Sequence, residues 1–124
     1  MTRLALLIGS ALIGSVFLGP AAMSASPVVE GTEFKTGKEI KIGLEGWVDK
    51  ASTEYVRDSM AYGYVIGVHD ALAGSAVCGG GDVTQGKVVE VVLTYMRQNP
   101  EILDHSADRV IAAALETVWP CRKS

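Results

Sequence analysis

The sequence has few of the residues that usually carry catalysis or bind metals. It contains two histidines and two cysteines among 124 residues, and they form neither an HExxH motif nor a Cys/His cluster. No serine lies in a nucleophile-elbow pattern. His69 and His105 each adjoin an aspartate, but adjacent residues on a helix do not face each other. We therefore predict no enzyme, no cofactor and no metal, with a two-histidine metal site as the remaining alternative.

Basic residues are also few and scattered. Eleven lysines and arginines stand against 14 acidic residues, and the formal net charge is −3. Lys35, Lys38 and Lys41 form one spaced face, unlike the basic stripe that follows nucleic-acid phosphates. The three glycines at residues 79–81 lack the preceding strand and the lysine spacing of a P-loop. We expect no nucleic-acid partner.

The one long apolar run lies at the N-terminus, where Arg3 precedes an uncharged segment at residues 4–18. This pattern is typical of an export signal. The run is shorter than the roughly 20 residues of a spanning helix, which disfavours the alternative of an uncleaved membrane anchor. We expect residues 1–25 to be removed by a cut after Ser24 or Ala25, leaving a periplasmic protein with no membrane contact.

The expected mature chain has about 100 residues, which suffices for one domain with one core. Because the periplasm is oxidising, we expect Cys78 and Cys121 to form one disulfide. Closing this loop of about 40 residues stabilises a fold by about 4 kcal/mol in the chain-entropy model. Neither cysteine has a Cys-x-x-Cys partner or an adjacent activating base, so the bond is expected to be structural.

Helical periodicity follows an extended leader at residues 26–35, which contains Pro27 and Gly31. We expect helices at residues 36–48, 53–73, 84–98 and 106–118, a loop at 74–81 and a turn at 101–104. The expected N-caps are Ser52 or Thr53 for the second helix, Asp82 (paired with Gln85) or Thr84 for the third, and Ser106 for the fourth. Valine-rich residues 88–93 could equally form a buried strand, but the flanking helical signals favour a helix. The predicted fold class is an all-α bundle of four to five helices.

Apolar side chains at helical spacing are the expected core. They are Ile40, Leu44, Trp47, Tyr55, Tyr62, Val65, Ile66, Leu72, Val88, Val89, Val91, Val92, Leu93, Tyr95, Met96, Ala107, Val110, Ile111, Ala114, Leu115 and Val118. Gly63 and Gly67 lie inside the second helix, where each costs about 1 kcal/mol relative to alanine. We expect a closely packed neighbouring helix to compensate, since charged residues on this helix disfavour a membrane dimer motif.

A series of spaced residues runs through the predicted domain. It consists of Phe34, Thr36, Gly37, Gly63, Tyr64, Val65, Gly67, Val68, Asp70, Ala71, Leu72, Cys78, Val83, Thr84, Val88, Val89, Tyr95, Pro100, Ala107, Val110, Ala113, Ala114, Leu115, Trp119, Pro120 and Cys121. In order and spacing it resembles the Rap/Tai family of type VI secretion immunity proteins. The resemblance covers about 90 residues, and the expected domain is residues 36–124.

The resemblance implies a small helical periplasmic protein that binds a delivered toxin, typically a peptidoglycan amidase, and blocks its active site, often as a homodimer. Family members often carry a second cysteine pair between the first two helices. Here Ala61 and Gly43 or Leu44 occupy the matching positions. We therefore expect the first helix to be held by Ile40, Leu44 and Trp47 alone and to be looser or differently placed.

Two polar, non-periodic segments could project toward a partner, residues 74–82 and 97–105. The residues singled out are Gly79, Gly80, Asp82, Arg97, Gln98, Asp104 and His105. The alternative is that both segments are ordinary connections. The predicted function is inhibition of a cell-wall amidase toxin; the alternative is an envelope structural or stress-related binding protein of the same fold with no toxin partner.

Overall fold

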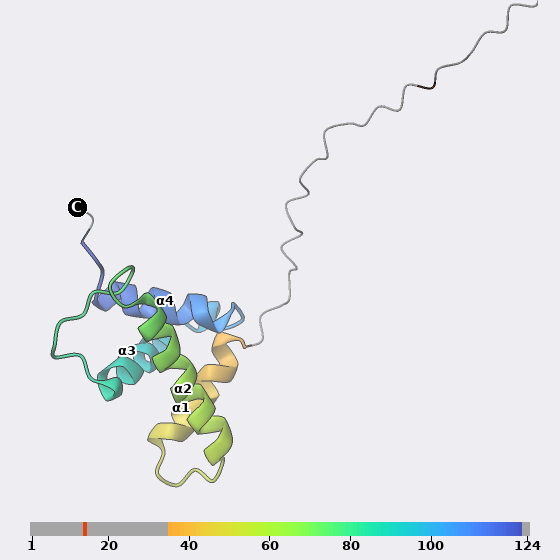
Figure 1. The fold of residues 1–124 in the computed structure, drawn as a ribbon. Helices are drawn as coiled ribbons and strands as arrows, with labels where there is room; N and C mark the ends of the chain where they lie inside the picture. Colours follow the sequence, from red (N-terminus) through yellow and green to blue (C-terminus); the bar gives the residue numbers. More distant parts are fainter. Residues whose placement is uncertain (1–13, 15–34, 123–124) are drawn as a thin grey trace, which may run out of the picture. The chain divides into compact units, whose positions relative to one another are not determined.

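The computed structural model describes residue 14 and residues 35–122 (Figure 1). Except for Gly14, the expected export signal lies outside the described residues, as does the expected leader up to residue 34. The helical domain is therefore considered by itself.

Four α-helices and one 3₁₀-helix make up the described domain (Figure 1). They are α1 (Gly37–Val48), α2 (Tyr55–Leu72), α3 (Gln85–Gln98), η1 (Pro100–Ile102) and α4 (Ala107–Val118). Each α-helix contacts the other three, and α1 with α2 forms the most extensive pair. The predicted all-α fold is confirmed, and residues 88–93 lie inside α3 rather than in a strand.

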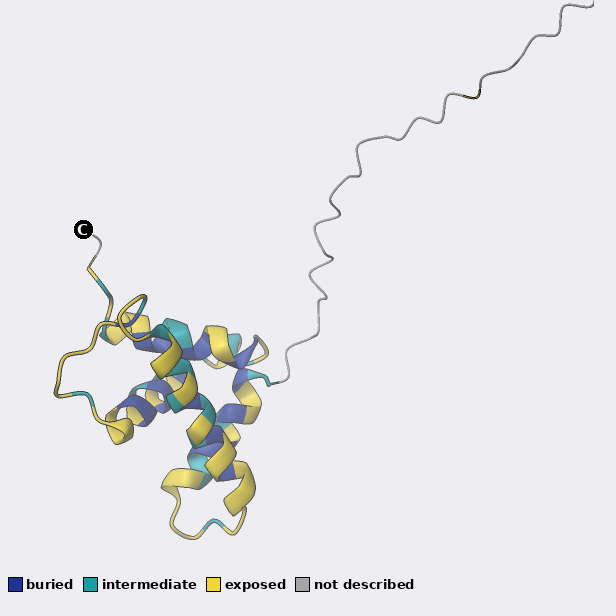
Figure 2. Ribbon diagram, viewed as in Figure 1, coloured by how far each residue is buried: buried dark blue, intermediate teal, exposed yellow. Residues whose placement is uncertain are grey.

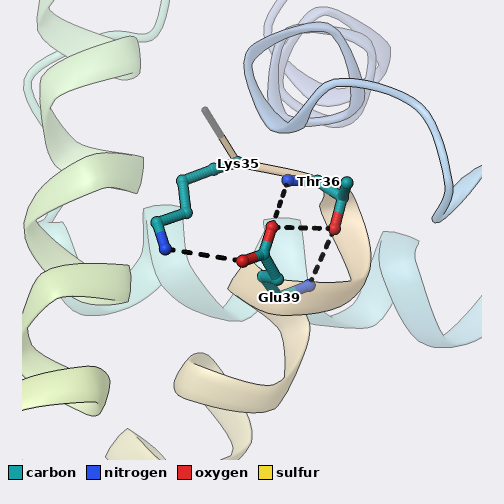
Figure 3. Close-up of polar contacts among 3 residues, drawn as sticks. All are labelled: Lys35, Thr36 and Glu39. Carbon is teal, nitrogen blue, oxygen red and sulfur yellow. Dashed lines mark hydrogen bonds and ion pairs between the residues drawn. The ribbon is translucent and has the colours of Figure 1, made fainter. Parts of the chain in front are cut away.

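A complete capping box fixes the start of α1 (Figure 3). The Thr36 hydroxyl accepts a hydrogen bond from the Glu39 backbone N–H at 3.3 Å, and the Glu39 carboxylate accepts from the Thr36 backbone N–H at 2.9 Å. The Lys35 ammonium adds a bond to the same carboxylate at 3.5 Å. The Thr36 N–H bond is the main cause of a lowered Glu39 pKa. These bonds satisfy backbone groups that a helix start leaves free.

The other helix starts agree only in part with the sequence. Thr84 caps α3 by accepting from the Lys87 N–H at 3.2 Å, so the expected Asp82 pairing is wrong. Ser106 occupies the N-cap position of α4, although its side chain makes no capping bond. The prediction of Ser52 or Thr53 for α2 is wrong, because the N-cap residue is Glu54.

The core lies where the four helices meet. Its buried side chains are Ile40, Leu44, Ala61, Val65, Val77, Val88, Val89, Val92, Leu93, Met96, Ala107, Val110, Ile111, Ala114 and Leu115. The prediction of burial is wrong for three residues: Trp47 is 46% exposed, Tyr55 73% and Val118 49%. The first two lie where the α1–α2 hairpin extends beyond the rest of the bundle, and this end is largely exposed in Figure 2.

The backbones of α1 and α2 approach each other closely at Gly43. A Cβ atom at Gly43 would lie 2.4 Å from the Ala61 Cβ and 3.1 Å from the Arg57 carbonyl oxygen. The resemblance noted from the sequence implies a second cysteine pair at Ala61 and at Gly43 or Leu44. Glycine-to-alanine packing and the buried side chains of Ile40 and Leu44 hold α1 against its neighbours. A looser or differently placed α1 than in relatives stays a prediction.

Gly63 and Gly67 do not pack against another helix of the described domain. Both are exposed, and a Cβ atom at either would meet nothing within 4 Å among the described residues. The predicted helix-packing role within the domain is wrong. The helix-propensity cost of about 1 kcal/mol per glycine has no compensation in the described domain.

Candidate partner-binding surface

The first half of the loop after α2 is fixed to the end of α4. The Cys78–Cys121 disulfide joins the two segments, with the Cα atoms 4.7 Å apart. The Cys78 N–H donates to the Trp119 carbonyl at 2.9 Å. Val77, the residue before Cys78, is buried. Gly74 has a φ of +82°, which favours glycine, and its N–H donates to the Val77 carbonyl at 2.8 Å. The expected disulfide is confirmed.

The second half of this loop projects from the bundle (Figure 1). Gly79, Gly80 and Asp82 are all exposed, as the sequence predicts. Gly79 is nevertheless confined, because a Cβ atom there would lie 2.5 Å from the Val83 Cγ2 atom. Gly80 has open space around it. The part of the loop free to meet a partner is therefore residues 80–82.

The second predicted segment, residues 97–105, anchors the start of α1. The Gly37 N–H donates to the His105 carbonyl at 2.9 Å, and the Lys38 N–H donates to the Leu103 carbonyl at 2.8 Å. The side chains singled out are exposed: Arg97, Gln98, Asp104 and His105. The backbone of this segment is thus a structural connection, and only its side chains could contact a partner.

The two predicted segments do not form one site. The loop ending at Asp82 is tied by Cys78 to the C-terminal end of α4, whereas residues 97–105 lead into its N-terminal end. Helix α4 has 12 residues, a length of about 18 Å at 1.5 Å per residue. One small partner element could not contact both segments at once.

Exposed aromatic and apolar side chains lie together on the α1–α2 hairpin, unlike the residues of the two predicted segments. We call Trp47, Val48 and Tyr55 the hairpin surface; all three are exposed and lie beside the turn between the helices. The Trp47 ring stacks on Tyr62 with centroids 4.4 Å apart. The Tyr62 hydroxyl donates to the Gln85 side chain at 2.5 Å, which links the stack to α3.

A groove of about 260 Å³ connects the hairpin surface to α3. Its lining includes Trp47 and Val48 on one side and Leu93, Thr94 and Arg97 on the other. The Arg97 Nε lies 3.5 Å from the Glu45 carboxylate, so the guanidinium is held beside the groove while remaining exposed. Arg97 is the one predicted partner residue that the structure places with this surface. Sequence reasoning missed Trp47 and Tyr55 because it assigned them to the core.

The turn that carries the hairpin surface is held by a buried carboxylate. Asp58 is 3% exposed, and its two oxygens accept from the Ser52 hydroxyl at 2.5 Å and from Arg57 Nη2 at 2.7 Å. A Cβ atom at Gly46 would collide with this carboxylate, so α1 needs glycine there. The Ser52 hydrogen bond and the Arg57 charge hold the Asp58 pKa below its ordinary value, against the opposing effect of burial.

We expect the Asp58→Asn variant to be less stable than the wild type at neutral pH, with a difference that shrinks in acid. The lowered folded-state pKa means that the carboxylate stabilises the fold above the unfolded-state value of about 4. This contribution is lost as pH falls through the folded-state pKa. The measurement is the urea midpoint of both proteins between pH 7 and pH 2. An unchanged difference across that range would contradict the assigned role of the carboxylate.

The described residues offer no metal site and no membrane span. Within residues 35–122, no three side chains of His, Cys, Asp or Glu are grouped so that they could bind a metal ion. The His69 ring lies beside its sequence neighbour Asp70, with Nδ1 3.1 Å from the carboxylate. None of the described helices combines the length and the apolar character needed to cross a bilayer.

Comparison with known proteins gives a family for this fold. The family model of the Rap1a immunity proteins matches residues 36–121. This range begins at the α1 cap and ends at the second disulfide cysteine, so it contains the whole helical bundle. No curated protein matches the sequence. Because the match covers well over half of the chain, the protein belongs to the Rap1a immunity proteins.

Proposed function

We propose that the protein is exported to the periplasm, where it binds a peptidoglycan amidase toxin and blocks the toxin's active site. Membership of an immunity-protein family supports a secreted toxin as the partner. The apolar N-terminal run and the disulfide support an oxidising compartment outside the cytosol. Inhibition then requires binding and no chemistry by this chain.

The observation that carries the binding step is the composition and support of the hairpin surface. Tryptophan, tyrosine and arginine are the residues most enriched at energetically important positions of protein interfaces. Trp47, Tyr55 and Arg97 bring all three types to one end of the bundle. The Asp58 network and the Tyr62 stack hold this end in place, which reduces the entropy lost on binding.

We propose the other exposed predicted residues as secondary contacts. Gly80 and Asp82 lie on the projecting loop, and Gln98, Asp104 and His105 are exposed where the chain passes from α3 to α4. Gly79 would position the loop rather than contact the toxin, because Val83 leaves no room for a side chain there.

Protection of bacteria tests the proposal. The probe is an amidase encoded beside the gene for this protein, fused to an export signal and expressed in a host that lacks immunity to it. Co-expression of the full-length chain is expected to prevent lysis, whereas a chain without residues 1–25 should not protect. Lysis in the presence of the full-length chain would contradict the proposal. The absence of any toxin gene at that position would favour the alternative of an envelope protein with no toxin partner.

The hairpin surface is tested by single substitutions. Trp47→Ala and Arg97→Ala are each expected to weaken amidase binding by about 30-fold or more, the effect of losing a hot-spot side chain. Val118→Ala is the matched control, because Val118 is an apolar residue about as exposed as Trp47 and lies at the C-terminal end of α4, outside the hairpin surface. Isothermal titration calorimetry gives the affinities. Equal affinities for all three variants and the wild type would exclude this surface as the binding site.

A further inference from the structure

The groove between the end of α1 and α3 presents an ordered row of side chains along α3. The α3 residues in its lining recur at spacings of three and four, so they lie on one face of the helix. They are Gly86, Val89, Glu90, Leu93, Thr94 and Arg97. Trp47 and Val48 from α1 form the opposite wall. We call this feature the α1–α3 groove.

The middle of the α1–α3 groove is apolar. Val89 and Leu93 are each 3% exposed, so they are the buried members of the row. Trp47 is 46% exposed and Val48 51%, so the opposite wall keeps much of its apolar surface in water. Apolar side chains of a partner that lie here would remove this surface from water, which favours binding.

Two opposite charges lie along the row. Glu90 is closer to the N-terminal end of α3, and Arg97 lies in the last turn of the helix. The two residues are seven positions apart, which is about 10 Å along the axis at 1.5 Å per residue. Both are exposed. The order of the charges therefore gives the groove a direction.

Neither charge is neutralised by a close ion pair within residues 35–122. The ion pair that Arg97 forms, from Nε to Glu45, is long at 3.5 Å. The Lys41 ammonium lies closer to the same Glu45 oxygen, at 2.7 Å. None of the ion pairs formed among the described residues includes Glu90. Both charged groups are thus available for ion pairs with a partner.

The spacing of the two charges selects a helix as the occupant. Residues seven apart in a helix lie two turns apart on one face, so an acid and a base at this spacing meet Arg97 and Glu90 together. In an extended strand, the same distance corresponds to about three residues, and side chains three apart point to opposite faces. An extended segment therefore presents only one of the two charges to the groove.

Helix dipoles select the direction of the occupant. An acidic residue is favoured near the N-terminal end of a helix and a basic residue near the C-terminal end. A helix in which the acid comes first can place its acid at Arg97 and its base at Glu90 only if it runs antiparallel to α3. This direction also brings opposite ends of the two helix dipoles together. The favoured occupant has an acid, apolar residues three and four positions later, and a base seven positions later.

We propose that the α1–α3 groove binds a helix of the toxin that has this pattern and runs antiparallel to α3. Arg97 pairs with the toxin's acidic residue, Glu90 pairs with its basic residue, and the apolar residues between them cover Trp47 and Leu93. Arg97 and Glu90 then determine which toxin the chain accepts, because like charges at these positions repel. The inference rests on the proposed function and adds the chemistry of the toxin surface that fits the groove.

Two synthetic helical peptides test the chemistry of the groove without a toxin. Both are alanine-based and have one composition. The first has an aspartate, two leucines three and four positions later, and an arginine seven positions later; the second has the aspartate and the arginine exchanged. NMR titration of the isotope-labelled protein is expected to show about 10-fold tighter binding of the first peptide, with a shift of the Trp47 indole signal. Equal binding of the two peptides would overturn the proposal.

Reversal of the groove charges supplies the sharper outcome. A chain with both Glu90→Lys and Arg97→Glu keeps the apolar wall but has the opposite charge order, so it should prefer the second peptide. Both substituted residues are exposed, so the fold should persist, and circular dichroism checks this. An unchanged preference for the first peptide would contradict the assigned roles of the two charges.

A second charge-reversed chain is the matched control. Arg109 and Glu116 are also exposed and seven positions apart, but they lie on α4 and outside the lining of the groove. A chain with Arg109→Glu and Glu116→Lys should keep the wild-type preference for the first peptide. A reversed preference in this control would mean that the peptides sense another surface, and it would overturn the proposal.

An amidase toxin that the wild-type chain inhibits tests whether the groove meets the toxin itself. Arg97→Glu is expected to weaken binding by about 100-fold, whereas Arg97→Lys, which keeps the charge, should weaken it less. Among lysine substitutions of the toxin's acidic residues, one should restore binding to the Arg97→Glu chain. If none does, the proposal is overturned while inhibition by the wild type still supports the proposed function.

Two further outcomes would also overturn the proposal. A wild-type chain that inhibits no amidase would contradict the proposed function together with the assignment of the groove to the toxin. A dimer of this chain that dissociates in the Arg97→Glu variant would assign the groove to a second copy instead. Size-exclusion chromatography of the wild type and the variant without toxin measures this.

Discussion

Replacing both cysteines by serine is expected to lower the free energy of unfolding by about 4 kcal/mol, the chain-entropy value for a loop of this length. Cys78 and Cys121 are 43 positions apart in sequence, so the disulfide removes a large set of conformations from the unfolded chain. Small domains are stable by only about 5–15 kcal/mol. The double variant should therefore be close to unfolding at physiological temperature. Urea denaturation followed by circular dichroism measures the change.

Reduction of the wild type supplies the matching control. The reduced protein should unfold at the same urea concentration as the Cys78→Ser/Cys121→Ser variant, because both lack the same covalent constraint. The N-terminal end of α4 should be less affected than the C-terminal end, where the Cys78 N–H donates a hydrogen bond to the Trp119 carbonyl. A loss of less than about 1 kcal/mol would mean that the non-covalent contacts alone hold this end.

Gly43→Val is expected to destabilise the fold by about 3 kcal/mol, near the upper end for overpacking. The added Cβ would overlap the Ala61 Cβ, and the Arg57 carbonyl closes the space beside it. The flexible end of a side chain could move aside, but a β-carbon and a backbone carbonyl cannot. The strain can be relieved only by separating α1 from α2, which uncovers Leu44. Thermal and urea unfolding both measure this loss.

Gly86→Val is the control for this prediction. Gly86 is also in a helix, but a Cβ there meets nothing within 4 Å. Its replacement should change the unfolding free energy by no more than about 0.5 kcal/mol, the usual range at an exposed site. If Gly43→Val were equally neutral, the two helices could not be as close as the structure places them.

The helices could be predicted from sequence because their apolar residues recur with the period of a helix. Thr84 and Ser106 marked helix starts correctly, since a hydroxyl residue before an apolar pattern is a local signal. The prediction of Ser52 as a helix cap was wrong for a reason that the local sequence does not contain. Its hydroxyl donates to Asp58, six residues further on, so the helix starts later. A bond of this kind depends on the folded position of α2.

The proposed binding surface was harder to predict than the fold. Trp47 and Tyr55 have the spacing of core residues, and periodicity alone cannot show that the hairpin extends beyond the helices that would cover them. Polarity directed attention to residues 97–105, where only Arg97 belongs to the surface found on the structure. The sequence did contain one signal of an exposed apolar surface. Apolar residues are spread almost evenly around α2, so a single packing face cannot bury all of them.

The most direct test of the central claim uses an amidase toxin, if one is encoded beside the gene for this protein, and titrates the purified toxin with purified protein. Hydrolysis of isolated peptidoglycan is the readout. The proposed immunity function predicts that activity falls in proportion to added protein and is abolished at one chain per toxin molecule, while the Trp47→Ala variant requires a large excess. Full hydrolysis in the presence of excess wild-type protein would contradict the proposed function.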